Sequence, residues 1–174
     1  MIPAAFVLLA NLGRPRKPSR ASARIAEPVL PDAVAASRQL AGVIALPVRE
    51  ADLPGLRDLQ RFARRAAEAL LEGAVPDAGV LNDLARDSSA RVRLTASSGA
   101  LRQELAWHDV SVAGQLARRL IEELAALDPT RLRRCAREQC GLFFYDSTRS
   151  RTQRWHAEDP CGWRERQHSR RARV

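Results

Sequence analysis

The first 134 residues of this 174-residue chain contain no cysteine, and aromatic residues make up only 5% of the sequence. Most of the aromatics lie after residue 142, so an earlier core has to be built from Ala, Leu and Val, which suits packed helices. Long hydrophobic runs are also missing. The apolar run Ala4–Ala10 is too short to span a membrane and lacks the preceding positive charge of a signal peptide. We therefore expect a cytoplasmic protein with no membrane partner.

Lysine is nearly absent as well: Lys17 is the only lysine, whereas the sequence has 28 arginines, and the net charge is +9. Residues 131–174 hold 12 arginines against five acidic residues, whereas residues 1–130 hold 17 basic and 15 acidic residues. A general preference for arginine explains why Arg replaces Lys, but it does not explain why the excess charge gathers at one end. Such a localised basic patch attracts phosphate backbones or other anionic surfaces.

The first 130 residues carry the signals of several helices. Helices are predicted from Asp32 to about Leu40, between Asp52 and Gly73, after Asp77, and over residues 111–127, from capping residues and apolar stripes at helical spacing. Residues 13–28, rich in Arg, Pro and Ser, are predicted to form a loop. The short segment Ala5–Leu12 is compatible with a strand or with a helical turn, because periodicity cannot decide over so few residues.

One hairpin is predicted among these helices. Apolar and polar residues alternate after Ala90, Ser97-Ser98-Gly99 can turn the chain, and the segment to Trp107 can return as a second strand. The predicted fold class is therefore mainly α within the α+β class. A helical domain with a small hairpin occupies residues 1–130, and a separate basic module occupies residues 131–174.

All three cysteines lie in this second module, in the pattern Cys135-x4-Cys140 followed by His156-x4-Cys161. Zinc favours four Cys or His ligands in a tetrahedron, and two close pairs supply such a set. Gly141 permits the left-handed backbone of a zinc knuckle. Asp159-Pro160 predicts a final helix that begins near Cys161. A knuckle on a hairpin with a further ligand at a helix entrance is the treble-clef arrangement, so we predict one structural zinc ion.

An enzymatic alternative is weaker. His156-Ala157-Glu158 and Pro160-Cys161 resemble two pieces of the zinc nucleobase deaminase signature. Those enzymes need another cysteine where Arg164 stands, and they need the two pieces on separate helices, whereas only Asp159 separates them here. Four protein ligands would also leave no coordination position for a reacting water. We therefore expect that the protein is not an enzyme.

The arginines of the module are candidates for phosphate contact, and the alternative is a solvated basic face. The predicted nucleic-acid-binding residues are Arg149, Arg151, Arg154, Arg164, Arg166, Arg170, Arg171 and Arg173. Trp155 and Trp163 are expected to pack around the metal core, with base stacking as the alternative. His108 and His168 belong to no ligand pattern and are expected to be structural or exposed.

The segment Arg131–Arg173 resembles the CGNR zinc finger, in which two cysteines, an F-x-D-x-S/T strand and loop, a further cysteine and a C-G-N-R turn precede a basic helix. Cys135, Cys140 and Cys161 match the family's ligands. His156 stands where the family usually has cysteine, and Trp163 replaces the asparagine of the name-giving turn. Upstream, Phe6-x4-Asn11-Leu12 and Leu81-Asn82 resemble the ABATE-domain family of bacterial stress-induced transcription regulators.

The resemblance implies a mostly helical N-terminal domain that senses a small-molecule effector, joined to a zinc module that binds DNA. Two functional hypotheses follow. The first is a DNA-binding transcriptional regulator of the stress-response type, which could form a homo-oligomer. The alternative is a zinc-stabilised module whose arginines bind RNA or an acidic protein without sequence-specific recognition of DNA, because arginine contacts to phosphate carry no sequence information.

Overall fold

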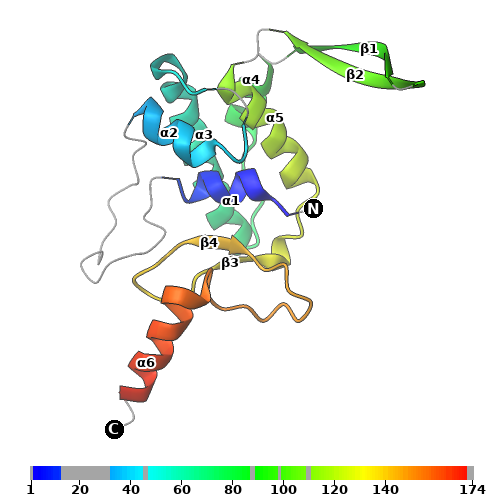
Figure 1. The fold of residues 1–174 in the computed structure, drawn as a ribbon. Coiled ribbons are helices and arrows are strands. Elements are labelled where there is room, and N and C mark those ends of the chain that lie inside the picture. Colours follow the sequence, from blue (N-terminus) through cyan, green and yellow to red (C-terminus); the bar gives the residue numbers. More distant parts are fainter. Residues whose placement is uncertain are drawn as a thin grey trace.

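The computed structural model describes residues 2–12, 32–44, 47–86, 89–97, 99–108 and 111–171, so the predicted loop 13–28 lies outside the described residues (Figure 1). The elements are α1 (Ala4–Ala10), α2 (Ala33–Leu40), α3 (Leu53–Leu71), α4 (Gly79–Arg86), β1 (Ser89–Ser97), β2 (Ala100–His108), α5 (Val112–Ala125), β3 (Leu132–Arg134), β4 (Phe143–Tyr145) and α6 (Trp163–Arg171). The described residues form a mainly helical fold with two small antiparallel hairpins, which confirms the predicted class. Within the described residues, no helix has both the length and the apolar character needed to cross a membrane.

The short helix α1 lies at the centre of the molecule and packs against α3, α5 and β4 (Figure 1). Its side chains Phe6 and Leu9 are fully buried in the main apolar core. A helix of seven residues is marginal in isolation, because few hydrogen bonds offset the cost of nucleation. Tertiary packing therefore decides between the strand and the helical turn that the sequence of this segment left open.

A buried carboxylate completes the start of α1. Glu123 of α5 accepts hydrogen bonds from the backbone N–H groups of Ala5 at 3.1 Å and Phe6 at 2.8 Å. Arg119, one turn earlier in α5, forms an ion pair with the same carboxylate at 3.2 Å. The first N–H groups of a helix have no partner within it, and its N-terminus favours negative charge. Glu123 thus fixes α1 onto α5.

The other predicted helices are confirmed with small shifts at their ends. Asp32 accepts a hydrogen bond from the backbone N–H of Ala35 at 2.7 Å, and Ser111 does the same for Gly114 at 2.9 Å. Asp77 accepts from Gly79 at 2.9 Å where α4 begins. Gly73, with φ of +77°, follows the end of α3. Capping residues therefore mark the starts of α2, α4 and α5, whereas Asp52 precedes α3 without a capping hydrogen bond to it.

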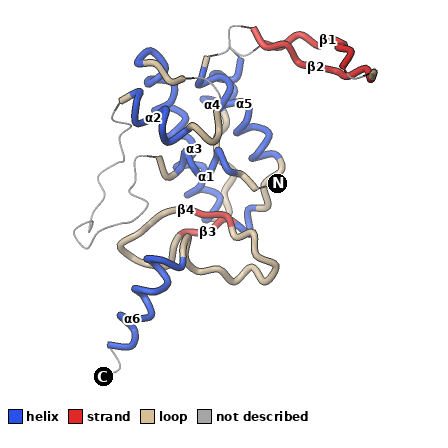
Figure 2. Tube along the Cα trace, in the orientation of Figure 1, coloured by secondary structure: helices blue, strands red, loops and turns tan. Residues whose placement is uncertain are grey.

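The predicted hairpin is confirmed and slightly longer than expected, with Ser89 paired to His108 and Ser97 paired to Ala100. Figure 2 shows it as a ribbon that projects away from the helices. Val92, Leu94 and Leu101 on this ribbon are exposed. The tight turn uses Gly99, whose φ of +77° is accessible to glycine at little cost.

The second hairpin, β3 with β4, joins the C-terminal module to the helices. Leu132 and Phe143 from these strands are buried in the same core as α1, α3 and α5. The Asn11 side chain, at the end of α1, donates to the backbone carbonyl of Phe143 at 2.7 Å and accepts from its N–H at 2.9 Å. The Asn11 side chain therefore makes the two hydrogen bonds to the Phe143 backbone that a neighbouring β-strand would make. The division at residues 130 and 131 stays a prediction, and the apolar core continues across it.

We predict that Asn11→Ala lowers the free energy of unfolding by about 1–3 kcal/mol, because it removes the hydrogen-bond partners of two partly buried backbone groups of Phe143. Chemical denaturation monitored by circular dichroism measures this change. Asn82→Ala, at an exposed position of α4, is the matched control and should change stability by less than about 0.5 kcal/mol. Equal stability of the two variants would show that Asn11 does not hold the strand.

Candidate metal centre

The four predicted ligands come from two separate stretches of chain. Cys135 follows β3 directly, and Cys140 lies in the turn that leads to β4. Cys135 donates its backbone N–H to Leu142 at 2.8 Å, Cys140 donates to Arg137 at 2.9 Å, and Gly141 adopts φ of +61°. The predicted knuckle is therefore formed. His156 lies in the long loop after β4, and Cys161 lies in the turn before α6.

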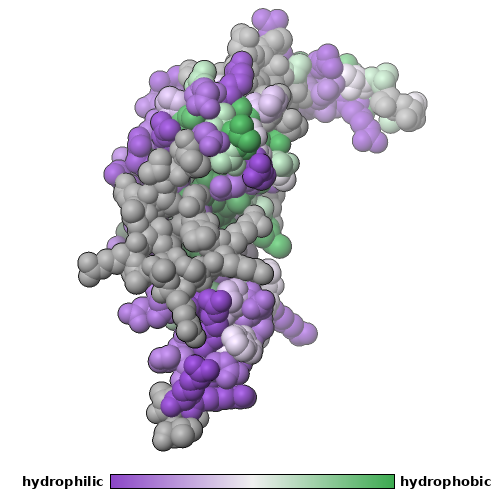
Figure 3. Space-filling model, turned by 60° about the vertical axis from the view of Figure 1, so that its left-hand side comes forward, coloured by the Kyte–Doolittle hydropathy of each residue, from purple (hydrophilic) through white to green (hydrophobic). Residues whose placement is uncertain are grey.

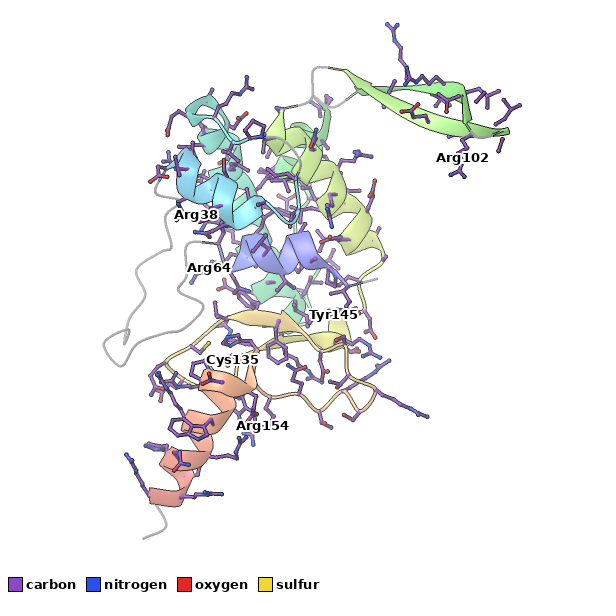
Figure 4. All side chains as sticks on the ribbon, in the orientation of Figure 1. Arg38, Arg64, Arg102, Cys135, Tyr145 and Arg154 are labelled. Atoms are coloured by element: carbon purple, nitrogen blue, oxygen red, sulfur yellow. The ribbon has the colours of Figure 1, made fainter. Side chains whose placement is uncertain are left out.

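The loop that carries His156 is organised by Asp146. Its buried carboxylate accepts hydrogen bonds from the backbone N–H groups of Thr148 and Gln153, both at 2.9 Å, and from the Thr148 hydroxyl. Farther along, the backbone carbonyl of Arg154 accepts from Ala136 N–H at 2.8 Å. The loop is thus attached to the knuckle just before His156, which brings the second pair of ligands to the first. Cys135 and Arg154 are labelled in Figure 4.

The ligand atoms of Cys135, Cys140, His156 and Cys161 all lie within 4.8 Å of one another. Cys140 Sγ is 3.3 Å from His156 Nδ1, so Nδ1 is the imidazole nitrogen that faces the thiols. Tetrahedral zinc with its usual Zn–S and Zn–N bonds separates its ligand atoms by about 3.6 Å. The donor set and its spacing therefore fit one zinc ion.

Residues 131–174 match the family model of the CGNR zinc finger. This part of the chain is a CGNR zinc finger. The match covers the whole predicted C-terminal module, including all four ligands. No curated protein matched the chain.

Cys135, Cys140, His156 and Cys161 form a candidate site for a single zinc ion in this finger, as the sequence predicted. The cysteines are buried and form no disulfide, so their thiols are available as ligands. The finger has only a small apolar cluster of its own, made by the three cysteines and Leu142, with Trp155 packed against it. Metal coordination thus supplies stability that a hydrophobic core supplies in larger domains.

Close packing explains the glycine that follows the last ligand. A Cβ atom on Gly162 would lie 3.1 Å from the Trp155 ring and would collide with the carboxylate of Glu158. The sequence predicted a helix that begins near Cys161. In the structure, Glu158–Gly162 forms a wide helical turn in which Asp159 has an extended conformation, and α6 continues from this turn at Trp163. Cys161 therefore lies in the helical turn that leads into α6.

The thiols influence one another strongly. The pKa of Cys135 is lowered to about 4, chiefly because the Cys140 thiol donates a hydrogen bond to it, and the same interaction raises the pKa of Cys140. Burial, followed by the nearby charge on Cys135, raises the pKa of Cys161. Several thiolates would repel one another in so small a space, and Zn²⁺ removes this penalty by binding them in deprotonated form.

Arg137 provides a positive charge beside the ligands. It is only 6% exposed, and its side chain hydrogen-bonds to Cys161, which opposes the rise in the pKa of that thiol. Three thiolates and one Zn²⁺ carry a net charge of about −1, so the guanidinium neutralises the centre. This role was not predicted from the sequence. The signal available there was an arginine between the two knuckle cysteines.

The predicted nucleic-acid-binding arginines fall into two groups. Arg151 and Arg166 form ion pairs with Asp128 and Glu158, and Arg154 lies over the Trp155 ring at 5.4 Å. The remaining described members are Arg149 in the loop and Arg164, Arg170 and Arg171 on α6. Arg173 lies outside the described residues. Figure 3 shows that hydrophilic residues gather over the end of the molecule formed by the finger.

We predict that the purified protein contains one zinc ion per chain. A strong chelator should remove it and unfold the finger, because structural zinc contributes about 10–16 kcal/mol to folding in small modules. Since Leu132 and Phe143 belong to the main core, the melting temperature of the helical part should fall as well. Elemental analysis and thermal circular dichroism measure both effects. A metal-free preparation with an unchanged melting temperature would exclude a structural metal.

Replacing the unusual ligand gives a second test of the centre. His156→Cys should keep zinc, because thiolate is a good zinc ligand, whereas His156→Ala should weaken binding by more than about 100-fold, beyond the usual effect of removing a hydrogen-bond partner of a ligand. Competition with a chromophoric chelator measures these affinities. His168→Ala removes an exposed histidine outside the centre and should leave the affinity unchanged. If His156→Ala bound zinc like the parent, another group would be the fourth ligand.

Proposed function

We propose that this protein is a DNA-binding transcriptional regulator of the stress-response type, in which zinc has a structural role. The observation that carries the proposal is a set of exposed arginines on α6 and on the loop that carries the ligand His156. Arg149, Arg170 and Arg171 are exposed and have no ion pair within the described part of the chain. Charges that are not neutralised by protein carboxylates are the ones that can replace counterions on a phosphate backbone.

The position of the metal supports this proposal. Cys161 lies two residues before α6, so coordination fixes the start of the helix that carries Arg170 and Arg171. A fixed helix loses less conformational entropy on binding than a flexible basic tail. Because four protein ligands would fill the tetrahedron, the proposal includes no open metal position and no catalytic reaction.

The proposed effector has a suitable place at the junction of the two parts. A cavity of about 770 Å³ lies between α1 and the finger, and its lining includes Leu8, Asn11, Tyr145, His156 and Asp159. This volume is in the range of small-molecule sites, about 300–1,000 Å³. A ligand there would contact both the central helix and the loop that carries a zinc ligand. We propose this cavity as the effector site of the helical domain.

The alternative function is an interaction module that binds RNA or an acidic protein. Contacts from arginine to phosphate position a protein on nucleic acid but do not read its sequence, so the exposed arginines are compatible with either partner. A comparison of salt-dependent affinity for duplex DNA, RNA and an acidic peptide separates these functions. Preference for one DNA sequence over others of equal length would favour the regulator.

We predict that replacing Arg149, Arg170 and Arg171 with alanine weakens duplex DNA binding at low salt. It should also lower the slope of log affinity against log salt by about one unit for each phosphate that the variant no longer neutralises. Fluorescence anisotropy over a range of salt concentrations, with zinc content verified, measures this effect. The matched control replaces Arg65, Arg91 and Arg102, three exposed arginines of the helical part and hairpin, and removes the same charge. Identical slopes for the two triple variants would contradict a specific role of the finger.

A further inference from the structure

Trp163 is the first residue of α6, and its side chain is 54% exposed. It belongs to neither of the two apolar clusters formed by described residues. Trp155, in contrast, is half-buried and packs against the zinc ligands. Both tryptophans are expected from the sequence to pack around the metal core, and the structure gives that position to Trp155. An exposed indole on a basic helix therefore needs a different explanation.

Trp163 forms part of a groove between the knuckle turn and α6. The groove has a volume of about 710 Å³, and its floor and walls include Gln139, Trp163, Arg164, Gln167, His168 and Arg171. One side comes from the chain between Cys135 and Cys140, and the other comes from the helix that follows Cys161. Both sides are therefore attached directly to zinc ligands, so the metal would fix the width of the groove.

The groove combines an aromatic surface with hydrogen-bonding groups of both kinds. Gln139 and Gln167 carry amides that donate and accept, while Glu138 and Glu165 carry carboxylates that only accept. Arg137, Arg164 and Arg171 line the same groove, so the two carboxylates do not make it repel a phosphate. A nucleobase can use the carboxylates and the amides, because its amino groups donate to carboxylates and its ring nitrogens and carbonyls accept from amides. The lining thus offers partners for the edge of a base together with positive charge for the adjacent phosphates.

Positive charge lines the groove and continues beside it. Arg137, Arg164 and Arg171 belong to the lining, and the exposed Arg170 is the residue before Arg171 on α6. A basic surface that follows the backbone, next to an aromatic ring on which a base stacks, is the arrangement used by proteins that bind single strands. Stacking requires access to the face of a base, which a paired duplex hides between neighbouring base pairs.

We propose that this groove binds an unpaired base of a nucleic acid strand, which stacks on Trp163 while the adjacent phosphates contact Arg170 and Arg171. The inference rests on the proposed binding of nucleic acid and specifies its substrate, namely a strand with at least one unpaired nucleotide. A paired duplex would not present the face of a base to Trp163, so this stacking contact would be absent from duplex binding. DNA and RNA strands present the same base face, so both are included in the test.

The test uses the full-length, zinc-loaded protein with labelled single-stranded DNA, single-stranded RNA of the same sequence, and the corresponding DNA duplex. Trp163→Ala should weaken binding to at least one of the single strands by about 5- to 150-fold, the effect expected when one base–aromatic stack is removed. Duplex affinity should change by less than about twofold. Trp163→Phe should restore most of the single-strand affinity, because a phenyl ring can also stack.

Two controls make the result specific. Val75→Ala, at an apolar position that is 93% exposed and far along the sequence from the finger, should leave all affinities unchanged. A strand of abasic sugar-phosphate should bind the parent and Trp163→Ala equally, because it has no base to stack. Zinc content and the melting temperature of each variant verify that the finger is folded.

The outcomes separate this inference from the proposed function. If Trp163→Ala binds single strands like the parent while the arginine triple variant loses affinity, the stacking site is excluded and nucleic-acid binding stands. If Trp163→Ala weakens duplex and single strand equally, Trp163 does not contact a base face, and the inference is wrong. If the parent binds none of the three nucleic acids, both the inference and the proposed function are excluded.

Discussion

The constraint on which the finger depends is the need to keep three thiols and an imidazole within 4.8 Å of one another. The apolar cluster around them contains little besides the ligands, Leu142 and Trp155. Such a cluster buries too little surface to offset the conformational entropy of a chain of this length. In the absence of metal, the three thiols could not all be deprotonated, because neighbouring thiolates repel one another. Metal binding converts this unfavourable assembly into the centre that holds β3, β4 and the start of α6 together.

The helical part of the chain contributes the second source of order. Asn11 supplies both a donor and an acceptor to Phe143, and the buried side chains of Leu132 and Phe143 extend the core of the helices into the finger. The stabilities of the two parts are therefore coupled. Removal of zinc would weaken the apolar packing of the helices, and removal of α1 would remove an element that packs against β4. A ligand that altered the position of α1 would act on the finger through this same packing.

The sequence was sufficient for features that depend on local chemistry. Ligand spacing predicted the zinc set, and capping residues predicted the starts of helices, because each effect acts over only a few residues. The conformation of α1 could not be predicted, since Glu123, more than 100 residues later in the chain, completes its N-terminus. Nor does the sequence distinguish buried arginines from exposed ones. Arg137 is buried beside the zinc ligands, whereas Arg166 is exposed and pairs with the exposed Glu158.

A short path of contacts connects the metal to the outer surface. Cys161 is bound at one end of the turn, Gly162 lies against Glu158 and the Trp155 ring, and Trp163 begins the helix. A Cβ atom on Gly162 would lie 3.1 Å from the Trp155 ring, so the ring or the turn would have to shift slightly to admit it. The groove beside Trp163 has one wall on each of these elements, so its shape depends on the zinc ligands even though the indole itself is exposed. Any partner that contacts both walls must therefore bind the metal-loaded finger more tightly than the metal-free chain.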